Sequence, residues 1–456
     1  MRNAAARKCD LFFQAALTPD GWRRDVLVSV ENGVIQTVTP NFVAGSARRL
    51  GVALPGMPNL HSHAFQRGMA GLAEAAGPGP DSFWSWREIM YRFVDRITPD
   101  ILRSIAAFAY VEMLESGFTR VGEFHYLHHD RDGVAFADPA EMSAAILAAA
   151  ADSGIALTHL PVFYAHSGFG GAAPTERQRR FITGIDGYEK LLTSALRAAA
   201  ALPDTVVGIA PHSLRAVTPD ELAALQALAG TGPVHIHVAE QMREVEDCLA
   251  WSGQRPVEWL LDHAAVNARW CLVHATHLTQ AEVSGLARSR AVAGLCPVTE
   301  ANLGDGIFPA SSFVAQGGAY GIGSDSNVLI DAAEELRLLE YGQRLSLRRR
   351  NIMAPAEAST GETLFRAALV GGAQALGGAA GIAPGMPADI VSLNMGHVAM
   401  AGRTPENCLD GLVFAGARAA IDGVWRRGEP VVEAGRHRNR DRIETDYRQA
   451  LAVLLN

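Results

Sequence analysis

The middle of this chain alternates between two kinds of segment, and this alternation constrains the fold more than any other feature. Short apolar runs are separated by Ala-, Leu-, Glu- and Arg-rich stretches that have the composition of helices. Such a pattern is typical of βα units around a parallel sheet. The runs are "GVALPGMPNL", "FTRVGEF", "IALTHLPVFY", "TVVGIAP", "GPVHIHV", "RWCLVHA", "AVAGLCP" and "AYGIGSD". Eight such runs favour a closed (β/α)8 TIM barrel, with an open sheet as the alternative.

Helices are expected between these runs at 101–116, 139–153, 187–201, 219–229, 255–264 and 279–288. The two ends of the chain have a different sequence pattern, in which short runs of alternating apolar and polar residues are broken by Gly, Pro and Asp-Gly turn signals. These runs are "CDLFFQAAL", "RDVLVSVENG" and "VIQTVTP" near one end and "GMPADIVSLNMG", "LVFAGA" and "AAIDGVWRRGEPVV" near the other. Because chain ends commonly lie close together, we expect one small β-sandwich domain built from 1–53 and 385–434. The barrel would then occupy 54–384, and 435–456 would form a C-terminal helix.

Composition narrows the choice of partner. The formal net charge is −8 over 456 residues, and Lys and Arg are scattered rather than gathered in runs. This argues against nucleic acid or an anionic membrane as a partner and favours a small molecule. The five cysteines lie far apart with no C-x-x-C pair, which suggests reduced thiols. With no strong signal segment and no long apolar window, we expect a cytoplasmic protein; a homodimer is left open.

Metal-ligand residues gather where the predicted strands end. In a barrel of this kind the chemistry lies at the carboxyl ends of the strands. His61 and His63 end the first run, and residues i and i+2 of a strand point to the same face. A third nitrogen from His237 and a carboxylate oxygen from Asp325 would complete a shell for one divalent ion. Zn²⁺ is the metal expected first and Fe²⁺ the second candidate, with one position left for water.

These residues resemble the pattern of the amidohydrolase superfamily. The pattern has H-x-H on strand one, H-x-x-E on strand five, His on strand six and Asp on strand eight, and the resemblance covers nearly the full length. Binuclear members carry a bridging carboxylated Lys on strand four, whereas the run "TVVGIAPHSLRAV" contains no Lys. The chain is therefore similar to the mononuclear deaminase branch.

Four segments resemble the formimidoylglutamate deiminase family of histidine degradation: "MPNLHSHAFQRGMAG", "APHSLRAV", "HVAEQ" and "CPVTEANLGDGIFP". In that family a formimino group on glutamate is hydrolysed to formyl, with release of ammonia. The resemblance implies that the metal ligands are His61, His63, His237 and Asp325, and that Glu240 and His274 take part in proton transfer. It implies that the substrate is held by Gln66, Arg87, Tyr126, His212 and Arg215.

The chemistry of these groups suits hydrolysis of an amidine-like C=N bond. A divalent metal lowers the pKa of a bound water to about 7. Asp325 can accept a proton from that water, His274 can orient the attacking oxygen, and Glu240 can pass a proton to the leaving nitrogen. The sequence leaves open which of the three takes the first proton. Arg87 and Arg215 suit a dicarboxylate substrate, because a guanidinium pairs with a carboxylate through two parallel hydrogen bonds.

Two other functions stay open at this point. One is a deaminase of a purine or another cyclic amidine, although two arginines suit a dicarboxylate better than an apolar ring. The other is a scaffold that has lost its metal, although no expected ligand is missing from the sequence. A Gly/Pro-rich loop at 71–80, followed by the Trp-rich segment that carries Arg87, is a candidate cover for the site.

Overall fold

The computed structural model describes residues 7–43, 49–75 and 83–455. Its centre is built of two parallel sheets, with strand orders β5-β6-β7-β8 and β10-β11-β12-β13, and β9 pairs with β7. The first sheet comprises β5 (Met57–Ser62), β6 (Phe118–His125), β7 (Ala156–Phe163), β8 (Val206–Val207) and β9 (Ala210–Pro211). The second comprises β10 (Val234–Val238), β11 (Trp270–His274), β12 (Val292–Leu295) and β13 (Ala319–Ile322).

Parallel bridges join the two sheets at both of their edges. Ile209 and Ser213 bridge to Val234 and His237 on β10, and Ser62 at the end of β5 bridges to Asp325 after β13. The backbone N–H of Asp325 donates to the His61 carbonyl at 3.0 Å, and that of His63 donates to the Asp325 carbonyl at 2.9 Å. These links close a ring of parallel strands, the arrangement of a (β/α)8 barrel, and each of the eight runs supplies a strand of it.

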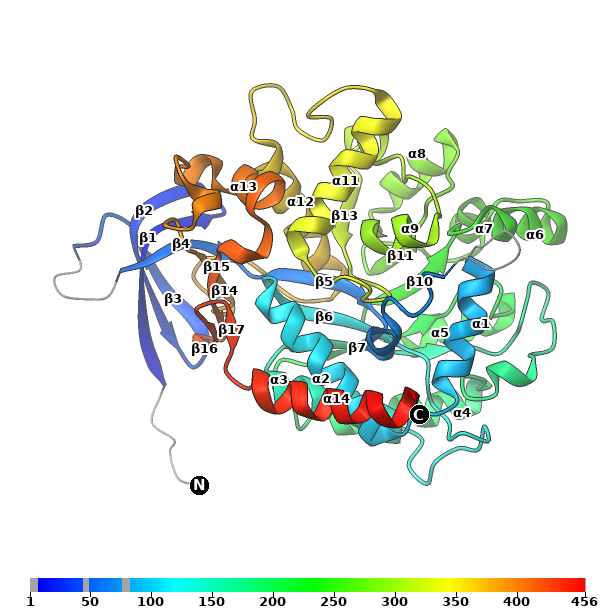
Figure 1. Ribbon diagram of the computed structural model, residues 1–456. Coiled ribbons are helices and arrows are strands. Elements are labelled where there is room, and N and C mark those ends of the chain that lie inside the picture. The colour runs from blue at the N-terminus through cyan, green and yellow to red at the C-terminus, as the bar shows by residue number, and fades with distance from the viewer. Residues whose placement is uncertain (1–6, 44–48, 76–82, 456) are drawn as a thin grey trace.

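Helices surround this ring (Figure 1). They are α1 (Phe83–Val94), α2 (Pro99–Glu115), α3 (Glu141–Ser153), α4 (Ile185–Ala199), α5 (Pro219–Leu228), α6 (Met242–Ser252), α7 (Pro256–His263), α8 (Gln280–Ser289), α9 (Pro297–Leu303), α10 (Ala310–Ala315), α11 (Ala332–Leu347) and α12 (Thr360–Ala375). Capping residues fix where several of these helices begin. In α5 and α8, Thr218 and Thr279 each pair with a Glu three residues later in a capping box, and α5 has Pro at its first position.

Strands from both chain termini form one further sheet, drawn at the left of Figure 1. Its order is β17-β16-β15-β14-β4-β1-β2-β3. The strands are β1 (Lys8–Thr18), β2 (Gly21–Glu31), β3 (Val34–Thr39), β4 (Arg49–Pro55), β14 (Ile390–Leu393), β15 (Ile421–Arg426), β16 (Glu429–Glu433) and β17 (Arg436–His437). β4 joins the two halves, because it pairs with β1 on one side and β14 on the other. The shared sheet matches the expectation from the sequence, whereas a two-layered sandwich and the domain boundaries stay predictions.

Two expectations need correction in detail. The run "LVFAGA" was expected to be a strand, but Leu412–Gly416 forms a single π-helical turn after α13 (Cys408–Gly411). A short apolar run cannot be assigned to a strand or a buried helical turn by its pattern alone. The run "GVALPGMPNL" is two strands rather than one. It breaks at Gly56, so that β4 belongs to the terminal sheet and β5 to the barrel.

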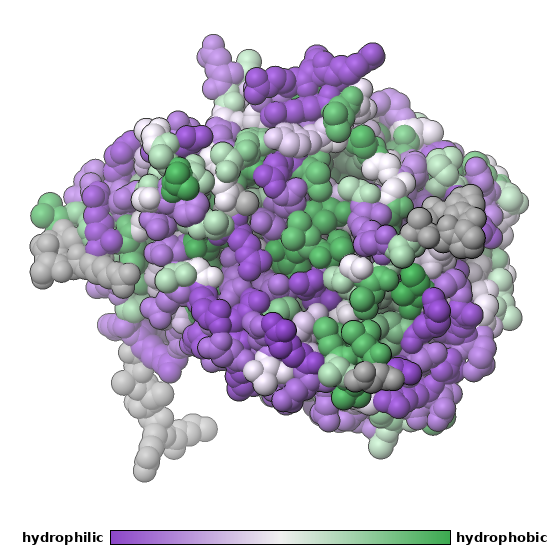
Figure 2. All heavy atoms as spheres, in the orientation of Figure 1, coloured by the Kyte–Doolittle hydropathy of each residue, from purple (hydrophilic) through white to green (hydrophobic). Residues whose placement is uncertain are grey.

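The apolar core is divided between the terminal sheet and the barrel. Phe13, Val28, Ile35 and Trp425 belong to a core cluster within the terminal sheet, separate from the large core of the barrel and its helices. On the face seen in Figure 2, hydrophobic side chains gather over the middle of the molecule and hydrophilic ones dominate its edges. The final helix, α14 (Arg440–Leu455), lies against α2, where Tyr447 stacks on Phe108 with ring centroids 4.1 Å apart. In the described ranges, no helix is long and apolar enough to cross a membrane.

Candidate metal centre and its cavity

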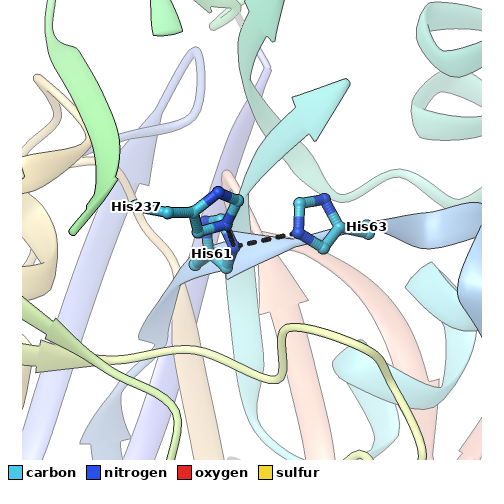
Figure 3. Close-up of side chains that lie close together, drawn as sticks. All are labelled: His61, His63 and His237. Atoms are coloured by element: carbon cyan, nitrogen blue, oxygen red, sulfur yellow. Dashed lines mark hydrogen bonds between the residues drawn. The ribbon is translucent and has the colours of Figure 1, made fainter. Parts of the chain in front are cut away.

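Three buried histidines converge in the barrel. The Nε2 atom of His61 lies 3.2 Å from Nε2 of His63 and 3.0 Å from Nε2 of His237. Figure 3 shows the three imidazoles pointing toward one another, His61 from β5, His63 from directly after it and His237 from β10. His61 and His63 therefore share a face, as their i, i+2 spacing predicts. One nitrogen from each ring lies within 4.8 Å of the others, which is close enough for one ion to contact all three.

Hydrogen bonds and burial leave these rings in the form that a metal ligand requires. Nδ1 of His63 donates to the Phe124 carbonyl at 2.9 Å, and Nδ1 of His237 donates to the His212 carbonyl at 3.1 Å. A ring that donates from Nδ1 keeps the lone pair of Nε2 for a metal. Burial lowers the pKa of His61 to about 3 and also lowers the pKa of His63 and His237. All three rings are therefore neutral near pH 7, the form that binds a cation.

Asp325 supplies a carboxylate to the same point. Its Oδ1 atom lies 3.3 Å from Nε2 of His63 and 3.6 Å from Nε2 of His61. Burial by itself would raise the pKa of Asp325, but its interactions with His61, His274 and His63 outweigh burial and lower that pKa. The backbone of Asp325 has φ +44°, which is uncommon for a residue other than glycine. A left-handed residue at this point turns the chain out of β13 directly at the histidines.

A buried hydrogen-bond network, formed by Asn59, Ser324 and Asn327, connects the first and last strands beside this centre. Nδ2 of Asn59 donates to Ser324 Oγ at 2.6 Å, and Ser324 Oγ donates to Asn327 Oδ1 at 2.6 Å. Nδ2 of Asn327 then donates to the His63 carbonyl at 3.1 Å. All three side chains of the network are fully buried. They hold the His63 and Asp325 segments in register, a role that no spacing in the sequence indicated.

His274 lies among three carboxylates. Its Nε2 atom is 3.7 Å from Asp325 Oδ2 and 3.8 Å from Glu240 Oε1, and its Nδ1 atom is 3.2 Å from Glu300 Oε1. Burial lowers the pKa of His274, but Glu240, Glu300 and Asp325 outweigh burial and raise it well above its ordinary value. Burial raises the pKa of Glu240 to about 7. This pair can therefore hold and exchange protons near neutral pH.

Backbone conformation again decides where His274 points. Cys271 and Val273 of β11 pack with Leu60 in one core cluster, so strand alternation alone would place His274 on the opposite face. The chain reaches φ +66° at His274 and +48° at Ala275. These angles end the extended backbone and aim the ring at Glu240 and Asp325. Near His274, Glu300 accepts a hydrogen bond from the Cys296 N–H at 2.9 Å.

The substrate residues predicted from the sequence line one cavity together with this centre. Gln66, Arg87, Tyr126, His212 and Arg215 share it with His63, His237, Glu240, His274 and Asp325; His61 lies beneath the lining, in contact with His63 and His237. Nε2 of Gln66 donates to the Tyr126 hydroxyl at 2.8 Å. Gln66 Oε1 and the Nε atoms of Arg87 and Arg215 are buried without a hydrogen-bond partner among the described residues. Buried unpaired polar atoms are costly, so these atoms suit a polar ligand.

Other residues of the cavity were not anticipated as part of the site. Tyr91, Tyr164, Phe181 and Trp86 form much of its wall, and Tyr164 is held by the Gln178 side chain, whose Nε2 donates to its hydroxyl at 2.8 Å. Only the Trp-rich composition of the segment at 83–91 hinted at aromatic walls. The Gly/Pro-rich loop expected at 71–80 lies partly outside the described residues.

A parallel α/β barrel with buried imidazoles and a carboxylate converging at the strand ends defines a class, that of barrel hydrolases built around a metal-ligand cluster. The family comparison makes this specific. The model of the Amidohydrolase family matches residues 52–431, so the chain belongs to the Amidohydrolase family, and the resemblance seen in the sequence is confirmed.

Individual relatives add detail. The chain is 52% identical over 451 residues to a protein of Pseudomonas aeruginosa named formimidoylglutamate deiminase, covering 98% of this chain and 99% of that one. It is 28% identical to a 5-methylthioadenosine/S-adenosylhomocysteine deaminase of Nitratidesulfovibrio vulgaris, covering 94% of both chains. Among solved structures, an amidohydrolase from Brucella melitensis superposes with a TM-score of 0.95 and 54% identity, covering 98% of this chain and 100% of the other.

Proposed function

We propose that this protein is a formimidoylglutamate deiminase, which hydrolyses N-formimino-L-glutamate to N-formyl-L-glutamate and ammonia. One observation carries the proposal: a single cavity is lined both by residues of the histidine centre and by two arginines whose Nε atoms are buried and unpaired among the described residues. The name of the 52% identical relative supports the choice of substrate, since it covers nearly the whole of both chains. The reaction adds one water across the C=N bond and expels the terminal nitrogen as ammonia.

The proposed cofactor is one divalent ion, Zn²⁺ in the first place and Fe²⁺ in the second. His61, His63, His237 and Asp325 would hold it, and three neutral imidazoles with one carboxylate fit the preference of both metals. When bound, such an ion acts as a Lewis acid that lowers the pKa of a water molecule to about 7.

The protein's own residues would then manage the protons. Asp325 Oδ2 and Glu240 Oε1 face the same nitrogen of His274, at 3.7 and 3.8 Å. A protonated His274 can hydrogen-bond the attacking oxygen and stabilise negative charge on it. Glu240, with its pKa near 7, can receive a proton that originates from the attacking water and pass it to the departing nitrogen, which leaves Glu240 deprotonated for the next cycle.

The remaining residues would orient the substrate. Arg87 and Arg215 would each pair with a carboxylate, and Gln66 Oε1 can accept a hydrogen bond from a formimino N–H. Burial keeps the pKa of His212 well below its ordinary value, with Arg215 adding to the effect, so its imidazole is neutral. A neutral ring beside Arg215 can hydrogen-bond a carboxylate without adding charge.

A ring deaminase is the second candidate function. Two observations favour it: the aromatic side chains of Tyr91, Tyr164 and Phe181 in the cavity wall, and a 27% identical relative named 8-oxoguanine deaminase. The dicarboxylate proposal is preferred because a purine has no carboxylate to form paired, charge-assisted hydrogen bonds with the two arginines. A cytoplasmic location and a homodimer stay predictions from the sequence.

The test is ammonia release by metal-loaded protein offered either N-formimino-L-glutamate or a purine. We expect the first compound to be turned over and the second to be left intact. Arg215→Met should raise KM for N-formimino-L-glutamate by about 10- to 100-fold, the cost of one charge-assisted hydrogen-bonding group. Arg197→Met, which removes an exposed arginine of α4, is the matched control. Turnover of the purine alone, or an unchanged KM for Arg215→Met, would reject the proposed substrate.

A further inference from the structure

We propose that Trp84 is a specificity-determining residue, whose indole positions the arginines that select a dicarboxylate. The inference rests on the proposed function and extends it to a residue outside the sets of metal, proton-transfer and substrate residues. It concerns recognition of the substrate rather than the chemical step.

Three guanidinium groups surround this one indole. The Cζ atom of Arg87 lies 4.6 Å from the centre of the Trp84 ring, that of Arg243 4.7 Å, and that of Arg215 5.8 Å. All three distances are within the range of about 6 Å over which a cation is attracted to an aromatic face. Trp is the strongest of the aromatic side chains in this respect.

The three arginines come from different parts of the chain. Trp84 and Arg87 lie three residues apart on α1, and residues at this spacing are neighbours on a helix surface. Arg215 follows β9, and Arg243 lies in the first turn of α6. The indole therefore connects α1 to two segments that follow barrel strands. The side chain of Arg243 is 64% exposed and pairs with Asp247, which places it at the rim rather than inside.

Repulsion between the arginines explains why the Trp84 indole is needed. Arg87 and Arg215 both line the cavity, and the Nε atom of each is buried without a hydrogen-bond partner among the described residues. Two cations in one partly buried cavity repel each other, although the carboxylates of Glu244 and Glu240 offset part of the charge of Arg215. The negative face of the indole attracts both guanidinium groups without neutralising them. Both remain available to form paired hydrogen bonds with incoming carboxylates.

The experiment measures binding and turnover separately. Glutarate is a dicarboxylate with nothing to hydrolyse, so calorimetry of its binding to metal-loaded protein reports on carboxylate recognition without turnover. Trp84→Leu should weaken glutarate binding about tenfold and raise KM for N-formimino-L-glutamate by a similar factor, with a much smaller change in kcat. Trp84→Phe keeps an aromatic face and should stay within about threefold of the wild type.

Trp251→Leu is the control, because it removes a half-buried indole that packs against Phe169 and Trp259 rather than arginines. Circular dichroism checks that each variant is folded. Unchanged glutarate binding in Trp84→Leu, or an equal loss in Trp251→Leu, would overturn the inference. If the wild type binds glutarate in a Trp84-dependent way but releases no ammonia from N-formimino-L-glutamate, the proposed reaction fails and the role of Trp84 stands.

Discussion

Two groups of buried histidines lie in this barrel, and they differ in what their nitrogens face. The inner group, His61, His63 and His237, brings its Nε2 atoms together at the base of the cavity, which His63 and His237 line. In the second group, His125 ends β6, His128 follows it and His159 lies on β7. The ring centroid of His125 is 5.6 Å from that of His128 and 5.7 Å from that of His159. Both nitrogens of His125 and of His159 are buried without a hydrogen-bond partner in the described ranges.

Burial lowers the pKa in both groups, to about 3 for His61 and also for His159. A buried, neutral histidine is therefore not sufficient evidence for a metal site. The ligand-type nitrogens must also converge, and among the described residues only the inner group forms such a set made of histidines alone. Substitutions in the two groups should therefore differ in their effects on metal content, activity and stability.

His63→Ala should remove bound metal and lower ammonia release on the order of 10³-fold or more, because the metal supplies several kcal/mol of stabilisation to such a reaction. His159→Phe, a substitution in the second group, should keep its metal. Elemental analysis and an ammonia assay of the two purified variants measure this directly. Full metal content in His63→Ala, or its loss in His159→Phe, would reverse the assignment of the two groups.

Glu240→Gln should separate proton transfer from metal binding within the inner site. The amide keeps the shape of the carboxyl but cannot carry a proton, so kcat should fall by about 10²- to 10⁴-fold. Metal content should equal that of the wild type, since Glu240 faces His274 at 3.8 Å and is not one of the proposed ligands. A variant with near-normal kcat would show that Glu240 does not take part in proton transfer.

Asn327→Ala should loosen the inner group without removing a ligand. Its side chain donates to the His63 carbonyl and to Ser62 Oγ, both at 3.1 Å. Loss of a hydrogen bond that orients a ligand commonly costs about 10- to 100-fold in metal affinity. Competition with a chelator would measure the loss, and Asn302→Ala, at an exposed asparagine, serves as control. Equal affinity in both variants would mean that this network does not orient the ligands.

The second group should lower the free energy of unfolding at acid pH. Burial, followed by the charge of His128, lowers the pKa of His159 to about 3, whereas an unfolded histidine titrates near about 6.5. As the pH falls below 6.5 the unfolded chain takes up the proton first, so the free energy of unfolding decreases. At pH 5.5 this one residue should lower the free energy of unfolding by about 1.4 kcal/mol relative to pH 7.5.

His159→Phe cannot take up this proton. Between pH 7.5 and 5.5, the free energy of unfolding of this variant should therefore decrease by about 1.4 kcal/mol less than that of the wild type. Denaturant titrations at the two pH values give the difference, and His263→Phe, at an exposed histidine, is the control. A wild-type pH dependence in His159→Phe would show that this ring is already hydrated or protonated in the folded protein.

Much of the architecture could be predicted from local patterns. The apolar runs predicted the barrel strands, because a parallel strand buried on both faces reads as a short continuous apolar segment. The six expected helices lie within a few residues of α2, α3, α4, α5, α7 and α8. The pattern failed at Leu412–Gly416, where a short apolar run allows either a strand or a helical turn.

Local sequence was enough to identify the residue types of the site and the common face of His61 and His63, since side chains two apart on a strand share a face whatever the rest of the chain does. Tertiary structure alone decided how His274 and Asp325 enter the cavity, because their positive φ angles depart from the strand alternation that a sequence can predict. It also decided the contacts of Asn327 and of Trp84, which join segments distant along the chain. Such contacts depend on how strands and helices pack, and no local periodicity encodes them.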